Sequence, residues 1–397
     1  MEGVGFVIRI LRTVGVLLVF ALAACTGGGA ETPVPEPAPT TSRPASTSSR
    51  PVEPPSAPPS DIVVEPVQVC FQKSTTLAAE TWRTTDVEAA VDGLEVRHEG
   101  DKLIATRAGQ SWTVFTEAKA NMYRGGPIQI NRDWLVFLSA DSLDWDAPWR
   151  LNAWSVNRPD EKSWVIGEQK EPSISGFPLE QLRGSRVVWS QGLAGGGRAV
   201  MMHDLGTEVT KELARGNVYA PMFVGDDVVV WQSETLGAGV GVAGVDVGTG
   251  QPWAGDNPIT RMDAAGGQLV TDGTFWILAN VRAGEEPDRT YTTWFWRTGN
   301  SGPQELLNTD GPVYVPVSGA VAGGYYAFIS YMRGPHVADL NTGYVYRLWP
   351  EWADVAVDDG VATLRRPPAT KDGPRTVATL DLAKLVPSTD CDNPPRG

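Results

Sequence analysis

Residues 339–343 read Asp-Leu-Asn-Thr-Gly, and residues 246–250 read Asp-Val-Gly-Thr-Gly. In a tight turn of this kind glycine supplies a positive φ, and the Asp or Asn side chain hydrogen-bonds to the turn backbone. Related or degenerate copies begin at positions 155, 204, 295 and 381, so that successive turns lie 42 to 49 residues apart. The chain therefore contains an internal repeat of about 45 residues.

Each copy of the repeat also contains a short apolar run that is rich in valine and aromatic residues. The six runs are Trp134–Leu138, Val187–Trp189, Val228–Trp231, Phe275–Leu278, Tyr325–Ile329 and Val361–Leu364. Because Trp189, Trp231 and Trp276 lie inside valine-rich strands, we expect them to pack in the core and not to stack on a ligand.

A period of about 40–50 residues with roughly four short strands per unit is typical of a β-propeller. Six copies are clear, and Leu103–Thr106, a turn at Ala108-Gly109 and Trp112–Phe115 indicate a seventh. We predict an all-β propeller over residues 61–397, with seven blades favoured and six as the alternative. A pair of stacked β-sandwiches is the other architecture, but it does not predict a constant step.

The Asp-x-x-Thr-Gly turn resembles the turns of TolB-like, WD40-like and quinoprotein-like propellers, over about residues 65–390. Residues 246–253 come closest to a quinoprotein repeat, although their Trp arrives one residue early. The Gly-His and Trp-Asp pairs of WD40 repeats are missing. One stretch departs from the strand pattern: Leu77, Trp82, Val87 and Val91 predict a short helix over residues 77–91.

The first 24 residues carry a targeting pattern. Arg9 and Arg12 precede the apolar run Thr13–Leu22, which is too short to span a membrane, and Leu22-Ala-Ala-Cys25 follows. This order resembles the bacterial lipoprotein signal, which implies cleavage before Cys25, lipidation of its thiol with palmitate-type chains, and anchoring on the extracytoplasmic side of the cell membrane. The alternatives are an ordinary secretory signal with a chance cysteine and an uncleaved membrane helix.

Residues 25–60 form the predicted tether. Residues 31–60 contain ten prolines, with Ser, Thr and Ala between them and no aromatic side chain. Such a segment buries too little apolar area to offset its ordering entropy, so we expect disorder; a proline-rich ligand role is the other interpretation. The formal charge of −14 argues against nucleic acid and against docking on anionic lipid, both of which favour a basic surface.

Cys70 and Cys391 lie near the two ends of the repeat region. A propeller has to join its first and last blades. We predict that the strand Val67–Phe71 completes the last blade, which brings Cys70 beside Cys391 and allows a disulfide in an oxidising compartment. The alternative is a pair of free buried cysteines.

No catalytic, metal or cofactor motif emerges from the sequence. His98, His203 and His336 lie in different repeats, and the Gly-rich segment 192–197 lacks the Lys-Ser/Thr of a phosphate-binding loop. We therefore predict no metal, no cofactor and no assignable catalytic residue.

Long loops between the second and third strand of each repeat offer a candidate binding face, because these loops open on one side of a propeller. They span Ala140–Arg150, Gln191–Arg198, Glu234–Gly241, Arg282–Thr290, Tyr331–Pro335 and Pro367–Gly373. The candidate binding residues are Asp144, Trp145, Asp146, Trp149, Arg198, Arg282, Glu285, Arg289 and Arg333. Trp145 and Trp149 are expected to stack on a sugar or to grip a peptide, or else to cover the blade edge.

The favoured function is a binding or scaffold module for an envelope protein or a cell-wall glycan. The alternative is an extracytoplasmic carbohydrate-active hydrolase or lyase with carboxylates at the channel mouth. A sensor or quinone-type dehydrogenase is a third class, disfavoured by the missing cofactor motif.

Overall fold

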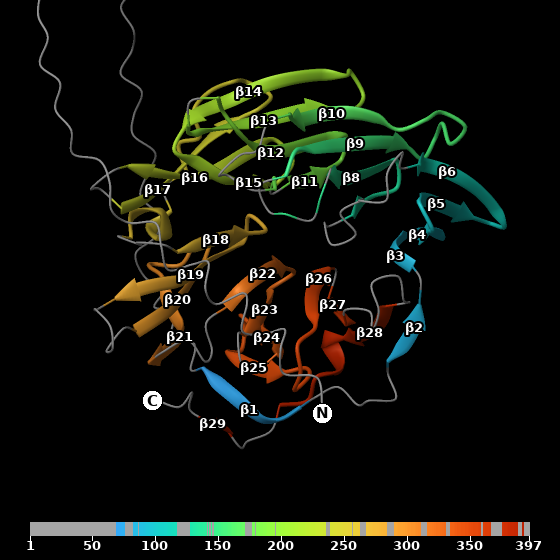
Figure 1. Cartoon of the computed structure of the whole chain (residues 1–397). Helices are drawn as coiled ribbons and strands as arrows, with labels where there is room; N and C mark the ends of the chain where they lie inside the picture. Colours follow the sequence, from blue (N-terminus) through green and yellow to red (C-terminus); the bar gives the residue numbers. More distant parts are fainter. Residues whose placement is uncertain are drawn as a thin grey trace, which may run out of the picture. The chain divides into compact units, whose positions relative to one another are not determined.

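The computed structural model places seven sheets around a ring, and their strands pair antiparallel except for one parallel pair (Figure 1). It describes residues 69–75, 82–85, 87–116, 128–140, 142, 144, 147–170, 177–178, 180–194, 196–235, 239–255, 257–262, 267–283, 290–310, 316–330, 334–358, 360–366, 375–387 and 391–392.

The first four blades follow one another along the chain. Blade 1 contains β3 (Val87–Val91), β4 (Leu94–Glu99), β5 (Lys102–Arg107) and β6 (Gln110–Thr116). Blade 2 contains β7 (Gln129–Ile130), β8 (Trp134–Ala140), β9 (Trp149–Ser155) and β10 (Trp164–Gln169). Blade 3 contains β11 (Glu180–Arg183), β12 (Arg186–Gly192), β13 (Arg198–Asp204) and β14 (Val209–Gly216). Blade 4 contains β15 (Val218–Val224), β16 (Val228–Thr235) and β17 (Gly239–Asp246), with a single bridge from Val245 to Pro252 in the place of a fourth strand.

The remaining three blades complete the ring. Blade 5 contains β18 (Gln268–Thr271), β19 (Phe275–Ala283), β20 (Thr290–Arg297) and β21 (Gln304–Asp310). Blade 6 contains β22 (Pro316–Ala322), β23 (Tyr325–Ser330), β24 (Gly334–Asp339) and β25 (Tyr344–Arg347). Blade 7 contains β26 (Asp354–Asp358), β27 (Val361–Arg366) and β28 (Arg375–Asp381). The predicted all-β propeller and its seven blades are confirmed.

The repeated aspartates lie at the end of the third strand in blades 3, 4, 6 and 7, where they begin the turn. Asp204 Oδ1 accepts hydrogen bonds from the backbone N–H groups of Gly206 and Thr207 at 2.9 and 3.0 Å, and Asp246 Oδ1 accepts one from Thr249 at 2.8 Å. The closing glycines Gly250 and Gly343 have φ values of 73° and 79°, which favour glycine. The turn chemistry that suggested the repeat is the chemistry that forms it.

The expected helix over residues 77–91 is wrong for the part that the structure describes. Residues 83–85 form the strand β2, and residues 87–91 form β3. The two strands pair with β28 and β4, so that backbone pairing with distant segments overrides the weak helical spacing. Among the described residues the only helical turns are η3 (Pro258–Arg261) and η5 (Leu382–Lys384), both of 3-10 type. No described helix is long and apolar enough to cross a bilayer.

A strand from the N-terminal side completes the last blade and a disulfide links the two ends of the repeat region, as expected, but the strand is a different one. The strand that completes blade 7 is β2, in which Arg83 is paired with Val377 and Thr85 with Arg375. The strand that carries Cys70, β1 (Cys70–Thr75), instead lies parallel to β25 as a fifth strand of blade 6, and β29 (Cys391–Asp392) pairs on its other side. The prediction that residues 67–71 complete the last blade is therefore wrong.

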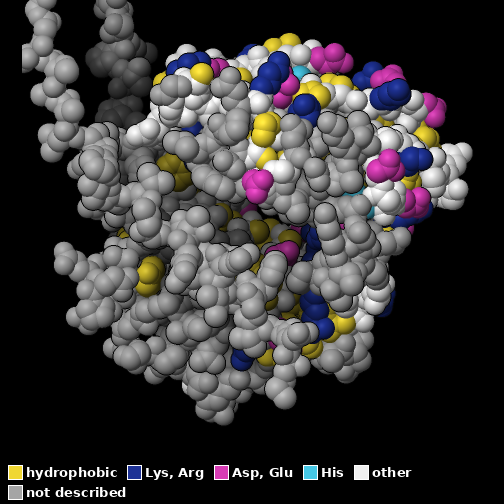
Figure 2. Space-filling model, in the orientation of Figure 1, with side chains coloured by type: hydrophobic (Ala, Val, Ile, Leu, Met, Phe, Trp, Pro, Cys, Tyr) yellow, Lys and Arg dark blue, Asp and Glu magenta, His cyan; other side chains and the backbone are white. Residues whose placement is uncertain are grey.

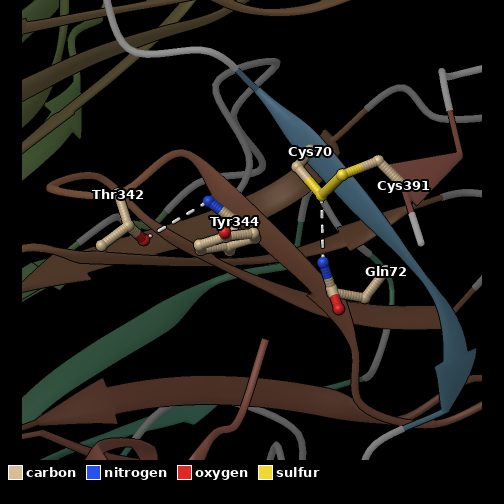
Figure 3. The surroundings of a disulfide bond; sticks show 5 residues. All are labelled: Cys70, Gln72, Thr342, Tyr344 and Cys391. Carbon is tan, nitrogen blue, oxygen red and sulfur yellow. Dashed lines mark hydrogen bonds between the residues drawn. A yellow bond between two sulfur atoms is a disulfide. The ribbon is translucent and has the colours of Figure 1, made fainter. Parts of the chain in front are cut away.

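The predicted disulfide is confirmed. Cys70 and Cys391 are bonded across β1 and β29, with their Cα atoms 5.1 Å apart (Figure 3). The side-chain amide of Gln72 donates a hydrogen bond to Cys70 Sγ at 3.0 Å. The bond joins segments 321 residues apart in the sequence.

Six hydrophobic clusters fill six of the interfaces between neighbouring blades in the described part of the chain. They lie between blades 1 and 2, 2 and 3, 3 and 4, 4 and 5, 5 and 6, and 6 and 7. Trp189, Trp231 and Trp276 are 1%, 6% and 2% exposed and belong to these clusters, as expected. The interface between blades 7 and 1 has no such cluster among the described residues.

Candidate functional site

The predicted long loops do join the second and third strands of their blades, so they open on one side of the ring. Among the candidate residues on them, Asp144 is exposed and Arg198 is half-buried at the start of β13. The backbone of Arg282 lies in β19, but its side chain is outside the described part. The other five candidate residues on these loops lie outside the described part of the chain: Trp145, Asp146, Glu285, Arg289 and Arg333.

Trp149 is described, and it is buried. Its ring is 2% exposed and packs with Trp189 in the cluster between blades 2 and 3. Its indole Nε1 has no hydrogen-bond partner. In this conformation the ring presents no platform to a ligand, and it covers the blade face, which was the alternative interpretation of the sequence.

Glu180 is a buried titratable residue that the sequence reasoning missed. It begins β11 and is paired in register with Trp189 of the neighbouring strand, so its side chain points into the interface with blade 2. Both carboxyl oxygens are buried without a hydrogen-bond partner, and burial raises the pKa of Glu180 to about 8. Among the described residues no second ionisable group contributes to this shift, so they provide no carboxylate pair there.

The interface between blades 7 and 1, which we call the seam, is polar on both sides. In β27, Ala362 and Leu364 pack against blade 6, so the alternate residues Thr363 and Arg365 face blade 1. In β4, Leu94 and Val96 pack against blade 2, so Glu95 and Arg97 face blade 7. Each of these strands therefore has one apolar and one polar face, as in a sheet that meets water on one side.

A cavity of about 800 Å³ opens along the seam. It is lined by Arg83, Thr85, Val87, Glu88, Ala89, Ala90, Glu95, Thr363, Arg365, Val377 and Thr379. In the space-filling view the middle of the ring is hollowed, and acidic and basic side chains are visible in the hollow (Figure 2). The cavity volume lies within the range of small-molecule sites.

Charged groups from four strands meet at the end of the seam that carries the long loops. The Arg375 guanidinium of β28 contacts the Glu88 carboxylate of β3, with Nε and Oε2 3.0 Å apart and the side chains 20% and 15% exposed. Arg365 lies opposite Asp354 of β26 in the sheet register. Burial lowers the pKa of Arg365, and the nearby Arg375 adds to this effect. Burial also raises the pKa of Asp354, against the opposing influence of Arg375 and Arg365.

Arg365 differs from its neighbour Arg375. Within the described residues, no hydrogen bond or ion pair reaches the Arg365 guanidinium, which lines the cavity. An arginine stays protonated at physiological pH, so the seam holds a cation. Two carboxylates, Glu88 and Asp354, act on Arg365 electrostatically, and Glu88 already pairs with Arg375.

The histidines do not gather into a site. They occupy β4, β13 and β24, in three different blades, and His336 is 2% exposed and stacks on Phe328. In the described part of the chain no group of three His, Cys, Asp or Glu residues is arranged to hold a metal ion.

No protein-family model and no curated protein matches this chain. Among solved structures it is similar to TolB from Acinetobacter baumannii, with 12% identity, a TM-score of 0.40, and coverage of 72% of this chain and 79% of that chain. An oligogalacturonate lyase in complex with manganese gives 11% identity, a TM-score of 0.46, and coverage of 76% and 90%. BamB from Moraxella catarrhalis gives 15% identity, a TM-score of 0.40, and coverage of 74% and 84%. At this level of likeness, the class of the protein, a seven-bladed β-propeller, rests on its own sheet topology.

Proposed function

We propose that this protein is a membrane-tethered, extracytoplasmic propeller lipoprotein that acts as a binding or scaffold module for an envelope protein or a cell-wall glycan. The observation that carries the proposal is the seam. A ring that packs six interfaces with apolar side chains keeps arginines and carboxylates at the seventh. Partly buried charges are weak contributors to stability, so their concentration in one cavity favours recognition.

The proposed location draws on the disulfide and on the sequence before the propeller. Disulfides form and persist in oxidising compartments, which supports export. Residues 1–24 are proposed as the signal peptide, with Cys25 as the lipidated residue and residues 25–60 as the tether. Residues 61–397 are proposed as the propeller domain, and the described strands from β1 to β29 support this assignment.

Glu180 favours the second candidate function, a carbohydrate-active hydrolase or lyase. A carboxyl that stays protonated near neutral pH is suited to a general acid. Such chemistry also needs a second carboxylate at a defined distance, and no ionisable group of the described residues affects the pKa of Glu180. Glu180 is also only 8% exposed, so we prefer the binding module.

Photo-crosslinking in the native envelope tests the proposed binding face. A photoreactive residue at the exposed position of Asp144 lies on the long-loop side, and one at Asp226, in the turn between β15 and β16, lies on the opposite side. We expect a discrete crosslinked envelope species from position 144 and none from position 226. Equal crosslinking from both positions would contradict a dedicated face.

Replacement of the predicted lipidated cysteine tests the anchor. The Cys25→Ser variant should leave the membrane fraction and appear as a released protein. Retention of this variant on membranes would rule out the lipid anchor, while the crosslinking result would stand separately.

A further inference from the structure

The unpaired guanidinium of Arg365 sets the chemistry of the seam cavity. Asp354 lies opposite it on β26, Arg375 lies beside it on β28, and Glu88 on the facing strand β3 is held by Arg375 at 3.0 Å. A partly buried cation without a direct partner is costly, and an anionic ligand group would remove that cost.

A carboxylate is the anion that fits these surroundings best. The planar guanidinium fork matches a carboxylate in a bidentate pair. The cavity lining also holds a second arginine, Arg83, and two carboxylates: Glu88, which is paired with Arg375, and Glu95, whose charge Arg83 offsets. The whole chain carries a formal charge of −14, which opposes the approach of a highly charged anion. A ligand with a single negative group avoids most of this repulsion.

The remaining walls point to a peptide. Three hydroxyl groups, from Thr85, Thr363 and Thr379, line the cavity and can both donate to and accept from peptide groups. The apolar part of the lining consists of alanines and valines, which leave room for small side chains. No aromatic side chain is among the described lining residues, which therefore offer no flat apolar platform for a sugar ring.

We propose that the seam cavity binds the free C-terminus of a short peptide with small side chains, and that Arg365 pairs with its terminal carboxylate. This inference rests on the proposed function as a binding module and names the ligand class of the seam. The threonine hydroxyls bind the peptide backbone, and the alanine and valine walls select small residues. The Glu88–Arg375 pair holds blades 1 and 7 at the spacing that keeps the cavity open.

Calorimetric titration of the purified full chain tests the proposal. The probes are tripeptides of Ala, Val and Ser, each as the free acid and as the C-terminal amide. We expect the free acids to bind and the amides to bind at least about 10-fold more weakly, because a hydrogen-bonded charge pair is lost. Arg365→Gln should weaken binding of the free acids by at least about 10-fold.

Arg183→Gln is the matched control, because Arg183 is an exposed arginine of blade 3 that pairs with Asp226 away from the seam. It should leave binding unchanged. If Arg365→Gln fails to fold, Thr363→Val is titrated in its place. This variant removes a hydroxyl group from the cavity without removing a charge, and it should weaken binding of the free acids.

Three results would overturn the proposal. The first is equal binding of the free acids and the amides. The second is the absence of any binding by the free acids. The third is binding of a sugar acid such as glucuronate that is lost in Arg365→Gln, while the peptides do not bind. None of these results affects the crosslinking from position 144 or the membrane release of Cys25→Ser, so failure of the ligand class and failure of the proposed function are distinguishable.

Discussion

The interface between blades 2 and 3 and the seam between blades 7 and 1 are built from the same kind of strands with different side chains. In blade 2, β8 is buried at almost every position, because both of its faces pack against neighbouring blades. In blade 7, β27 buries Ala362 and Leu364 on one face, whereas Val361 on the seam face is 39% exposed. Packing thus closes six interfaces of the ring, and the seventh is left open for polar groups.

The ring stays closed at the seam, although the side chains there are polar, because strand pairing and a disulfide link the two ends of the propeller. Backbone pairing of β2 with β28 connects the segment before blade 1 to blade 7. The Cys70–Cys391 bond links β1 and β29 at the outer edge of blade 6. In the described part of the chain these connections hold the ring without an apolar cluster at the seam.

The largest expected effect is the loss of a core ring between blades 2 and 3. Trp189→Ala should lower the free energy of unfolding by about 3–5 kcal/mol, because the ring is 1% exposed and its removal leaves a cavity. Thr379→Ala, at the seam, should change it by no more than about 0.5 kcal/mol. Urea denaturation measures both, and similar losses would erase the distinction between the two interfaces.

Removal of the disulfide comes next. Cys391→Ser should lower the free energy of unfolding by about 2–5 kcal/mol, because the bond closes a long loop of the unfolded chain. The unmodified protein in reductant is the control and should match the variant. An unchanged denaturation midpoint would show that strand pairing alone closes the ring.

Glu180 should make stability depend on pH. The folded state keeps the Glu180 proton up to about pH 8, whereas the unfolded chain loses it near the ordinary value of 4.5. The contribution of Glu180 to the free energy of unfolding is therefore fully present below about pH 4.5 and is lost as the pH rises toward about 8. This loss amounts to no more than about 1.4 kcal/mol per pH unit.

Glu180→Gln should flatten this dependence, and Glu161→Gln, which changes an exposed carboxylate of blade 2, should not. Denaturation at pH 5, 6, 7 and 8 gives the slopes. A slope that survives in Glu180→Gln would assign the pH dependence to other groups.

The smallest effect is expected for the charge pair of the seam. A double-mutant cycle with Glu88→Gln and Arg375→Gln should give a coupling of about 1 kcal/mol, since the pair is only partly screened by solvent. A coupling near zero would mean that the pair does not hold blades 1 and 7 together.

Much of the fold was predictable because the signals are local. The aspartate turns at 204, 246 and 339 bond to their own backbone, and the apolar runs that contain Trp189, Trp231 and Trp276 are the buried second strands. The helix expected over residues 77–91 failed because short strands such as β2 are specified by their distant partners.

The candidate site was harder to predict because it is marked only by a difference between strands of different blades: some strands alternate apolar and polar residues, and others are apolar throughout. The alternation in Val361–Arg366 and in Leu94–Glu99, set against the continuous apolar run of β8, marks the two strands with a polar face. That the two polar faces meet depends on ring closure. The burial of Trp149 and of Glu180 likewise depends on the blade that each one packs against.

From the amino-acid sequence alone the repeat, its turns and the buried tryptophans were predictable, because period and turn chemistry are properties of short segments. The same signals favoured seven blades over six and a bond between Cys70 and Cys391 over two free cysteines. Only the tertiary structure decided which N-terminal strand completes blade 7, and that Arg365, Arg375, Glu88 and Asp354 converge from four strands. Their convergence arises from segments about 290 residues apart in the chain, where no local preference specifies the contact.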